Sequence, residues 1–236
     1  MKFFYKINSL ISNTILLALS YVVKSKPMVR NAVPYISQFA NPAWAEMVLR
    51  DHQPITRDIM WPESGAETLE EYEQWVLSTC GMACTAMALQ FFFREPQETI
   101  TLAKEAATYG VYTVTDKEIS AMQYLPYVQW AKTKRMKARV YTKLTYRSMK
   151  QLLSSGALII ASVTPNIRGF NTVPATQVGG HLILITGYNA KDKTLTFHNP
   201  SGFENDQTQV NVTMQVREFV IYFAGRGIAV SPVRPR

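Results

Sequence analysis

The hydrophobic pattern of the chain divides it into a helix-rich first part and a strand-rich second part. Residues 78–93 carry no charge, and their apolar side chains lie on every side of a helical wheel. A helix that is apolar all round is typical of a buried one, so we predict a buried helix that starts near Cys80, with Ser78 or Thr79 as its cap. Weaker helical patterns predict further helices at 67–76, 98–109, 116–130 and 146–155, the third of them bent or broken by Pro126.

The second part of the chain carries short β-rich runs separated by Gly, Asn, Asp and Pro, a pattern typical of strands joined by turns. We predict strands at 157–163, 181–188, 194–198 and 219–223, and a short one at 228–230. Upstream, residues 33–38 contain Pro34 and predict an edge or lead-in segment, and residues 39–66 predict an irregular surface excursion. Helices followed by an antiparallel sheet define the α+β class.

The length and composition fit one folded domain with an N-terminal appendage. The chain has 236 residues, of which 47% are hydrophobic. A domain of this size buries enough apolar surface for a packed core. We place the domain at residues 31–236 and the appendage at residues 1–30.

The appendage is basic and partly apolar. Residues 1–30 carry five basic side chains and no acidic one, and residues 10–23 are largely apolar but interrupted by Ser, Asn and Thr. This apolar stretch is short for a membrane span, while the order of its residues resembles a secretory signal. A signal, a membrane anchor and a helix docked on the domain or on a membrane surface all fit the pattern. The pattern therefore leaves cytoplasmic, membrane-associated and secreted locations open, with membrane association through residues 1–30 among the alternatives.

Charge and cysteine content exclude several functional classes. The formal net charge is +8, but residues 31–236 hold 20 basic and 17 acidic side chains, so the domain is not expected to bind nucleic acid. A basic cluster at 132–137 predicts a solvated helix end. Cys80 and Cys84 make no disulfide framework, and neither CxxC nor HExxH spacing occurs, so no metal or organic cofactor is implied.

Cys80 lies where the buried helix begins, and this position suits a nucleophile. A thiol attacks a carbonyl carbon as the thiolate, and the unpaired N–H groups at a helix N-terminus favour negative charge. Gly81 allows the backbone of a substrate to come close. We therefore predict Cys80 as a nucleophile whose pKa lies below that of an ordinary thiol, and Cys84, one helical turn further in, as a buried core residue.

His181 is the best placed of the three histidines to act as the base. It follows Gly179-Gly180 and opens the strongest β run, whereas His52 lies in the irregular stretch. His198 is expected to face the other side of its strand. Asn199 ends the next strand, and antiparallel pairing can bring it to His181, where it would orient the imidazole.

Four segments carry a resemblance to a known family. In order along the chain they are Val33-Pro34-Tyr35-Ile36-Ser37-Gln38, Cys80-Gly81-Met82-Ala83-Cys84, Gly180-His181-Leu182-Ile183 and Asn199-Pro200. The series resembles the papain-like cysteine peptidases that process bacteriocins at double-glycine leaders. The chain looks like a stand-alone bacterial relative, because it has no room for transporter spans or a nucleotide-binding domain. The resemblance implies a papain-like cysteine peptidase fold, with N-terminal helices packed on a C-terminal antiparallel sheet.

The resemblance also implies a role for each motif residue. Cys80 would be the nucleophile, His181 the base, Asn199 the group that orients it, and Gln38 a donor in the oxyanion hole. The family has Asp where this chain has Asn199, and Asn can still accept the imidazole N–H bond without adding charge. Gln74 stands six residues before Cys80 and is the rival for the oxyanion role, but we prefer Gln38 because Gln74 falls within a predicted helix.

The leading interpretation is a cysteine peptidase or amide hydrolase with a Cys-His-Asn triad, acting on a peptide or amide substrate. An acyltransferase with the same triad is one alternative. A non-catalytic binding module on the same fold is another. The sequence leaves the substrate, the cleavage specificity and the oligomeric state open.

Overall fold

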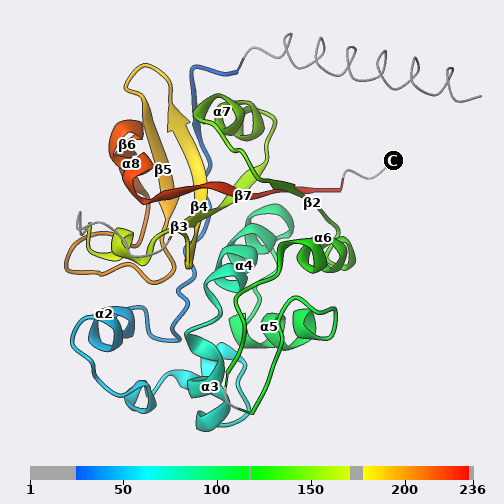
Figure 1. Cartoon of the computed structure of the whole chain (residues 1–236), viewed down its shortest axis with the longest axis vertical. Coiled ribbons are helices and arrows are strands. Elements are labelled where there is room, and N and C mark those ends of the chain that lie inside the picture. Colours follow the sequence, from blue (N-terminus) through cyan, green and yellow to red (C-terminus); the bar gives the residue numbers. More distant parts are fainter. Residues whose placement is uncertain (1–24, 117, 171–177, 234–236) are drawn as a thin grey trace, which may run out of the picture.

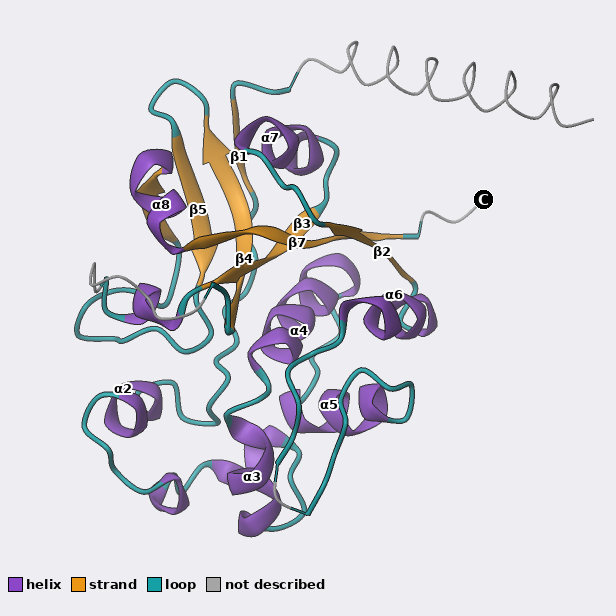
Figure 2. Ribbon diagram, viewed as in Figure 1, coloured by secondary structure: helices purple, strands orange, loops and turns teal. Residues whose placement is uncertain are grey.

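The structure of the protein is a computed structural model, which describes residues 25–116, 118–170 and 178–233. Its α-helices are α2 (Trp44–Leu49), α3 (Leu69–Val76), α4 (Cys80–Phe93), α5 (Thr99–Ala107), α6 (Tyr124–Thr133), α7 (Tyr146–Ser154) and α8 (Val216–Tyr222). Its strands are β1 (Met28–Arg30), β2 (Met136–Tyr141), β3 (Leu158–Val163), β4 (His181–Asn189), β5 (Thr194–His198), β6 (Val212–Gln215) and β7 (Phe223–Pro232). Short 3-10 helices occupy η1 (Ile55–Arg57), η2 (Trp61–Ser64) and η3 (Pro165–Arg168). Helices precede an antiparallel sheet, as Figure 2 shows, which confirms the α+β class.

The seven strands form one antiparallel sheet in the order β2-β7-β3-β4-β5-β6, with β1 paired to β4. Every residue of β3 is buried, and so are all but the last of β4. Burial on both faces explains why these strands read as continuous apolar runs. The register places His181 opposite Val163, so the predicted base stands at one end of the two central strands.

Alternate residues of the central strands face two separate hydrophobic cores, as the period of two in a strand requires. Leu158 and Ile160 pack with the helices α4, α5 and α6, whereas Ile159 and Ala161 pack with α7 and α8. Helices therefore cover both faces of the sheet. Figure 1 shows α4, α5 and α6 below it and α7 above it.

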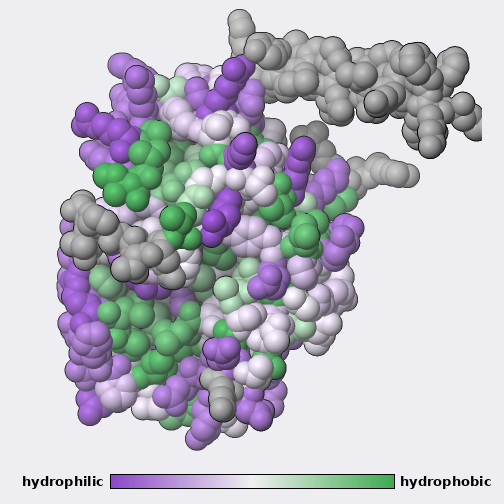
Figure 3. Space-filling view, in the orientation of Figure 1, coloured by the Kyte–Doolittle hydropathy of each residue, from purple (hydrophilic) through white to green (hydrophobic). Residues whose placement is uncertain are grey.

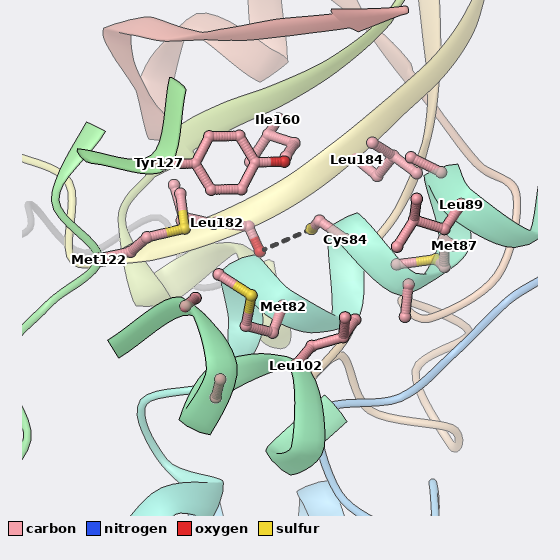
Figure 4. Packing of buried hydrophobic residues seen from close by; sticks show 14 of the residues in the cluster. Met82, Cys84, Met87, Leu89, Leu102, Met122, Tyr127, Ile160, Leu182 and Leu184 are labelled. Carbon is pink, nitrogen blue, oxygen red and sulfur yellow. Dashed lines mark hydrogen bonds between the residues drawn. The ribbon is translucent and has the colours of Figure 1, made fainter. Parts of the chain in front are cut away.

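The predicted buried helix is α4, and it connects the helical half to the sheet. Residues 81–89 are buried without exception. Figure 4 shows side chains of α4 packed beneath β4, namely Met82, Cys84, Met87 and Leu89 near Leu182 and Leu184. Cys84 is fully buried and its Sγ donates to the Leu182 carbonyl at 3.7 Å. Its predicted role as a core residue agrees with this packing.

The proline-rich excursion at residues 39–66 is organised around one buried carboxylate. Asp58 accepts hydrogen bonds from the Tyr72 hydroxyl at 2.5 Å, the Asn41 N–H at 3.2 Å and the Met60 N–H at 3.1 Å. These bonds satisfy a buried charge that would otherwise be costly. In Figure 3 the surface over α2 shows a hydrophobic area bordered by hydrophilic residues.

Two predicted elements are wrong. The helix predicted at 116–130 is absent from residues 118–123, and α6 starts only at Tyr124. Pro126 lies in the first turn of α6, where its missing N–H costs no helical hydrogen bond. The strand predicted at 219–223 is mostly helix α8, because the spacing of Phe219 and Tyr222 puts both rings on the face that packs against the sheet.

The other predicted helices and strands are confirmed, with shifted ends. The short strand at 228–230 belongs to the longer β7, while β1, β2 and β6 were not predicted. Glycines within β7 interrupt its apolar pattern. One of them, Gly227, lies so close to β3 that a Cβ there would come within 2.5 Å of the Ile160 carbonyl oxygen. The absence of a side chain is therefore part of the strand pairing.

Most of the N-terminal segment, including the apolar stretch in which a signal or anchor was considered, lies outside the described residues. Its last part, Met28–Arg30, is the strand β1 and pairs with Gly187 to Asn189 of β4. Among the described residues, no single helix has the length and apolar character of a membrane span. The bent pair α3 and α4 would meet that measure only when taken together, across an angle of 94°.

Candidate active site

A turn between α3 and α4 places Cys80 at the first residue of a helix, as predicted. The predicted cap is wrong. Thr79 occupies the cap position without capping the helix, because its hydroxyl donates to the Val76 carbonyl at 3.0 Å, and the Ser78 hydroxyl donates to the Ile119 carbonyl at 3.4 Å. The first N–H groups of α4 therefore have no side-chain cap. They can interact with negative charge that develops beside Cys80.

Cys80 lies against the start of β4. It lines the same cleft as His181, and its sulfur receives a hydrogen bond from the backbone of Leu182. Gly81 makes this approach possible, since a Cβ there would lie 2.5 Å from the Met122 sulfur and 3.0 Å from a methyl carbon of Leu182. The glycine next to the candidate nucleophile thus allows α4 and β4 to pack closely.

The imidazole of His181 is held by one ring nitrogen. Its Nε2 lies 2.8 Å from the Asn199 Oδ1 and 3.3 Å from the Ser201 hydroxyl, while its buried Nδ1 has no hydrogen-bond partner among the described residues. The Ser201 N–H also donates to the Asn199 Oδ1, at 3.3 Å, which identifies that atom as the acceptor. Since Oδ1 can only accept, Nε2 carries the proton and Nδ1 keeps its lone pair. The arrangement leaves Nδ1 available as a base.

The resting charges of Cys80 and His181 differ from the sequence prediction. Burial raises the pKa of the Cys80 thiol, and the Leu182 backbone and the Arg168 charge offset this only in part. Burial and the Arg168 charge lower the pKa of His181 well below its usual value, against the opposing effect of the Asn199 hydrogen bond. The prediction of a lowered Cys80 pKa is therefore wrong, because desolvation disfavours both charged forms. Near pH 7 the pair rests as a thiol and a neutral imidazole.

The two candidate glutamines occupy different surroundings. Gln74 lies in α3 and is exposed, with its amide 3.3 Å from the Thr115 carbonyl. Gln38 is buried, and its Nε2 donates to the Val76 carbonyl at 2.7 Å, just before the turn that leads into Cys80. Gln38 does not itself line the cleft. Its position beside this turn still favours it over Gln74.

The segments that carry the resemblance are brought together in space. The Gln38 N–H donates to the Pro200 carbonyl at 2.7 Å, and the Tyr35 hydroxyl donates to the Asn199 carbonyl at 3.3 Å. His198 accepts the Asn211 N–H on Nδ1 and donates from Nε2 to the Val33 carbonyl at 2.9 Å. Residues 33–38 form no strand, but they support the turn that presents Asn199. His198 has a structural role on the other side of that turn.

Two residues beside the site were missed from the sequence. Arg168 ends η3, and its Nε donates to the Ser201 hydroxyl at 2.8 Å. Ser201 in turn reaches His181, so a guanidinium is linked to the imidazole through one hydroxyl. The place of Ser201 directly after Asn199-Pro200 was a signal that could have found it. Nothing in the local sequence indicates Arg168.

The cleft around Cys80 and His181 has a volume of about 680 Å³. It is lined by Leu77, Ser78, Cys80, residues 121–126, Ser162, Gly180, His181, Leu182 and Arg226. The stretch 121–126 includes the residues wrongly predicted as helix, and they form one wall instead. Within the described part of the chain, no group of three His, Cys, Asp or Glu side chains could hold a metal ion.

Replacing Asn199 by Asp is expected to raise the pKa of His181. The carboxylate would keep the acceptor for Nε2–H and add a negative charge that favours the imidazolium, so the shift should be upward by about one pH unit, as for other close charge pairs. The measurement is an NMR titration of the His181 ring, assigned by comparison with His181→Gln. Asn199→Ala is the control, since it removes the acceptor without adding charge. A His181 pKa that is equal in the Asp and Ala variants would contradict the role given to Asn199.

Comparisons with known proteins place the chain in a family. Among solved structures, the crystal structure of the peptidase domain of Streptococcus ComA, described as a bifunctional ABC transporter involved in a quorum-sensing pathway, is similar at 15% identity and a TM-score of 0.40. That match covers 66% of this chain and 92% of the other. No curated protein matches the chain. A model of the Peptidase_C39 like family matches residues 30–226, which include all four motifs, and the chain therefore belongs to this family of cysteine peptidases.

Proposed function

We propose that the protein is an active cysteine peptidase that cleaves a peptide or amide bond with Cys80, His181 and Asn199. One observation carries the proposal. The Nε2 of His181 is fixed by Asn199, and its Nδ1 is left free at the cleft that Cys80 also lines. A nucleophile, a base and a group that orients the base are the parts that covalent acyl transfer requires.

In the first half of the reaction, the resting neutral pair makes general-base activation the starting step. His181 Nδ1 takes the thiol proton as the Cys80 sulfur bonds to the carbonyl carbon of the substrate. The N–H of Cys80 and the second N–H of the Gln38 amide are the candidate donors to the oxyanion. The imidazolium then gives its proton to the leaving nitrogen as the C–N bond breaks, which leaves a thioester on Cys80.

In the second half, water releases the acyl group. His181 Nδ1 takes a proton from the water as its oxygen attacks the thioester carbon. The C–S bond breaks, the sulfur recovers the proton, and the acid product leaves. If an amine attacks in place of water, the same steps give acyl transfer, which was the alternative considered from the sequence.

The proposal is tested by incubating the protein with a complex peptide library and identifying new termini by mass spectrometry. We expect new N- and C-termini in matched pairs, and an acyl adduct on Cys80 after acid quenching. Pairing of the acyl half with an added amine would indicate acyltransferase activity. If no termini or adducts form, and iodoacetamide modifies Cys80 no faster than an ordinary thiol of the same pKa, the protein is a binding module.

A further inference from the structure

The cleft that holds Cys80 and His181 is unevenly charged. Among the described residues that line it, Arg226 alone carries a formal charge once His181 is neutral, and none is acidic. Apolar side chains, including Leu77, Met122 and Leu125, contribute most of the rest. A substrate in this cleft would therefore meet a largely apolar surface with a single cation.

Arg226 is held at the cleft by the backbone beside His181. It follows Gly225 on β7, next to the place where the pairing of β3 with β7 shifts register. Its Nη2 donates to the Val178 carbonyl at 3.2 Å, which leaves other N–H groups of the guanidinium for a ligand. The long side chain thus has a defined position and spare donors.

A second donor lies beside this guanidinium. A Cβ built on Gly179 would be 2.5 Å from Arg226 Nη2 and 3.0 Å from the Ser162 hydroxyl, so both groups border the same glycine, two residues before His181. Ser162 also lines the cleft. Arg226 belongs to no ion pair among the described residues. A guanidinium with spare donors and a neighbouring hydroxyl is a suitable arrangement for binding a carboxylate.

We propose that Arg226 and Ser162 bind a carboxylate of the substrate, so that the enzyme prefers peptides in which an acidic group lies near an apolar residue at the cleavage site. The inference rests on the proposed function for the meaning of the cleft as a substrate site. The carboxylate could come from an Asp or Glu side chain or from the free C-terminus of a peptide. Both sources offer the same two oxygens to the guanidinium.

The test is protection of Cys80 against alkylation by iodoacetamide, which measures occupancy of the cleft without requiring turnover. The probes are N-acetylated, C-amidated peptides that carry Glu or Gln at one, two or three positions on either side of a leucine. A further set has Gln with a free C-terminal carboxylate. Peptide mapping by mass spectrometry distinguishes Cys80 from the buried Cys84.

We expect at least one acidic peptide to protect at about tenfold lower concentration than its Gln counterpart, as for a charge-assisted hydrogen bond. Protection by the side-chain set or by the free-terminus set identifies the source of the carboxylate. Arg226→Met should abolish the difference, Arg226→Lys should retain part of it, and Arg226→Glu should favour Lys peptides instead. Ser162→Ala should reduce it without removing a charge, which covers the case in which an Arg226 variant fails to fold.

Three results would overturn the inference. These are equal protection by Glu and Gln peptides, a difference that persists in folded Arg226→Met, and no protection by any peptide. Hydrolysis of library peptides could still be observed in each case, which would leave the proposed function standing. Conversely, charge-selective protection without hydrolysis would support the subsite and contradict the peptidase proposal.

Discussion

Replacing Cys80 by alanine is expected to lower kcat for any substrate found in the library by at least about a thousandfold, as loss of a catalytic nucleophile does in other acyl-transfer enzymes. Without the sulfur no thioester can form, whereas the cleft and the helix start remain. Substrate affinity should therefore change much less than turnover. Kinetics under single-turnover conditions, with binding measured separately, would show this division.

Cys84→Ala is the matched control. Cys84 is one helical turn from Cys80 but is fully buried, and its Sγ contacts the Leu182 carbonyl. Its removal should cost stability, about 1 kcal/mol or somewhat more for a small cavity and a lost weak hydrogen bond, and should preserve turnover. Cys80→Ala should show the opposite pattern, with thermal stability maintained and turnover lost. Retained hydrolysis in Cys80→Ala would remove this residue from the mechanism.

Replacing His181 by alanine is expected to lower kcat/KM by about 10²- to 10⁴-fold, the usual contribution of a general base. In the wild type, activity should fall as the pH drops through the lowered pKa of His181, because the imidazolium cannot accept the thiol proton. In the variant this acidic decline should disappear, and the remaining rate should rise with pH towards the raised pKa of Cys80. Hydrolysis rates of both proteins across pH provide the measurement.

His198→Ala is the control for this prediction. His198 is also buried, and it bonds the Val33 carbonyl and the Asn211 N–H rather than facing the cleft. Its loss should lower the unfolding midpoint, since two hydrogen bonds that join separate segments disappear. The acidic decline in activity should persist in folded His198→Ala. If that variant alone lost the decline, the base would be His198 and the assignment of His181 would be wrong.

The neutral resting pair connects these expectations. A preformed ion pair would react with iodoacetamide well below the pKa of an ordinary thiol. Here burial opposes charge on both partners, and Arg168 further disfavours the imidazolium. Asn199 provides an acceptor without the negative charge that an aspartate would bring. Asp at position 199 should therefore change the charge balance of the site as well as its geometry.

Local patterns were sufficient where one physical requirement dominated the sequence. Residues 78–93 lack charge because α4 is buried on all sides, and the strands β3 and β4 are apolar throughout because both faces are covered. The pattern failed at 219–223, where β-forming side chains fold as α8. There the spacing of Phe219 and Tyr222 fits the sheet surface better as a helix. Tertiary packing outweighed local propensity in that segment.

The sequence by itself determined the α+β class, the buried helix that begins at Cys80, and the motifs that select Cys80, His181 and Asn199 as candidates. Order along the chain and residue type were enough, because each motif residue is recognised by its neighbours. Only the tertiary structure decided which nitrogen of His181 is free, that Gln74 is exposed while Gln38 is buried, and that Arg168 and Arg226 stand near the site. It also decided that thiol and imidazole rest neutral. Desolvation and contacts between residues far apart in the chain depend on what surrounds each group in space, which spacing along the sequence does not record.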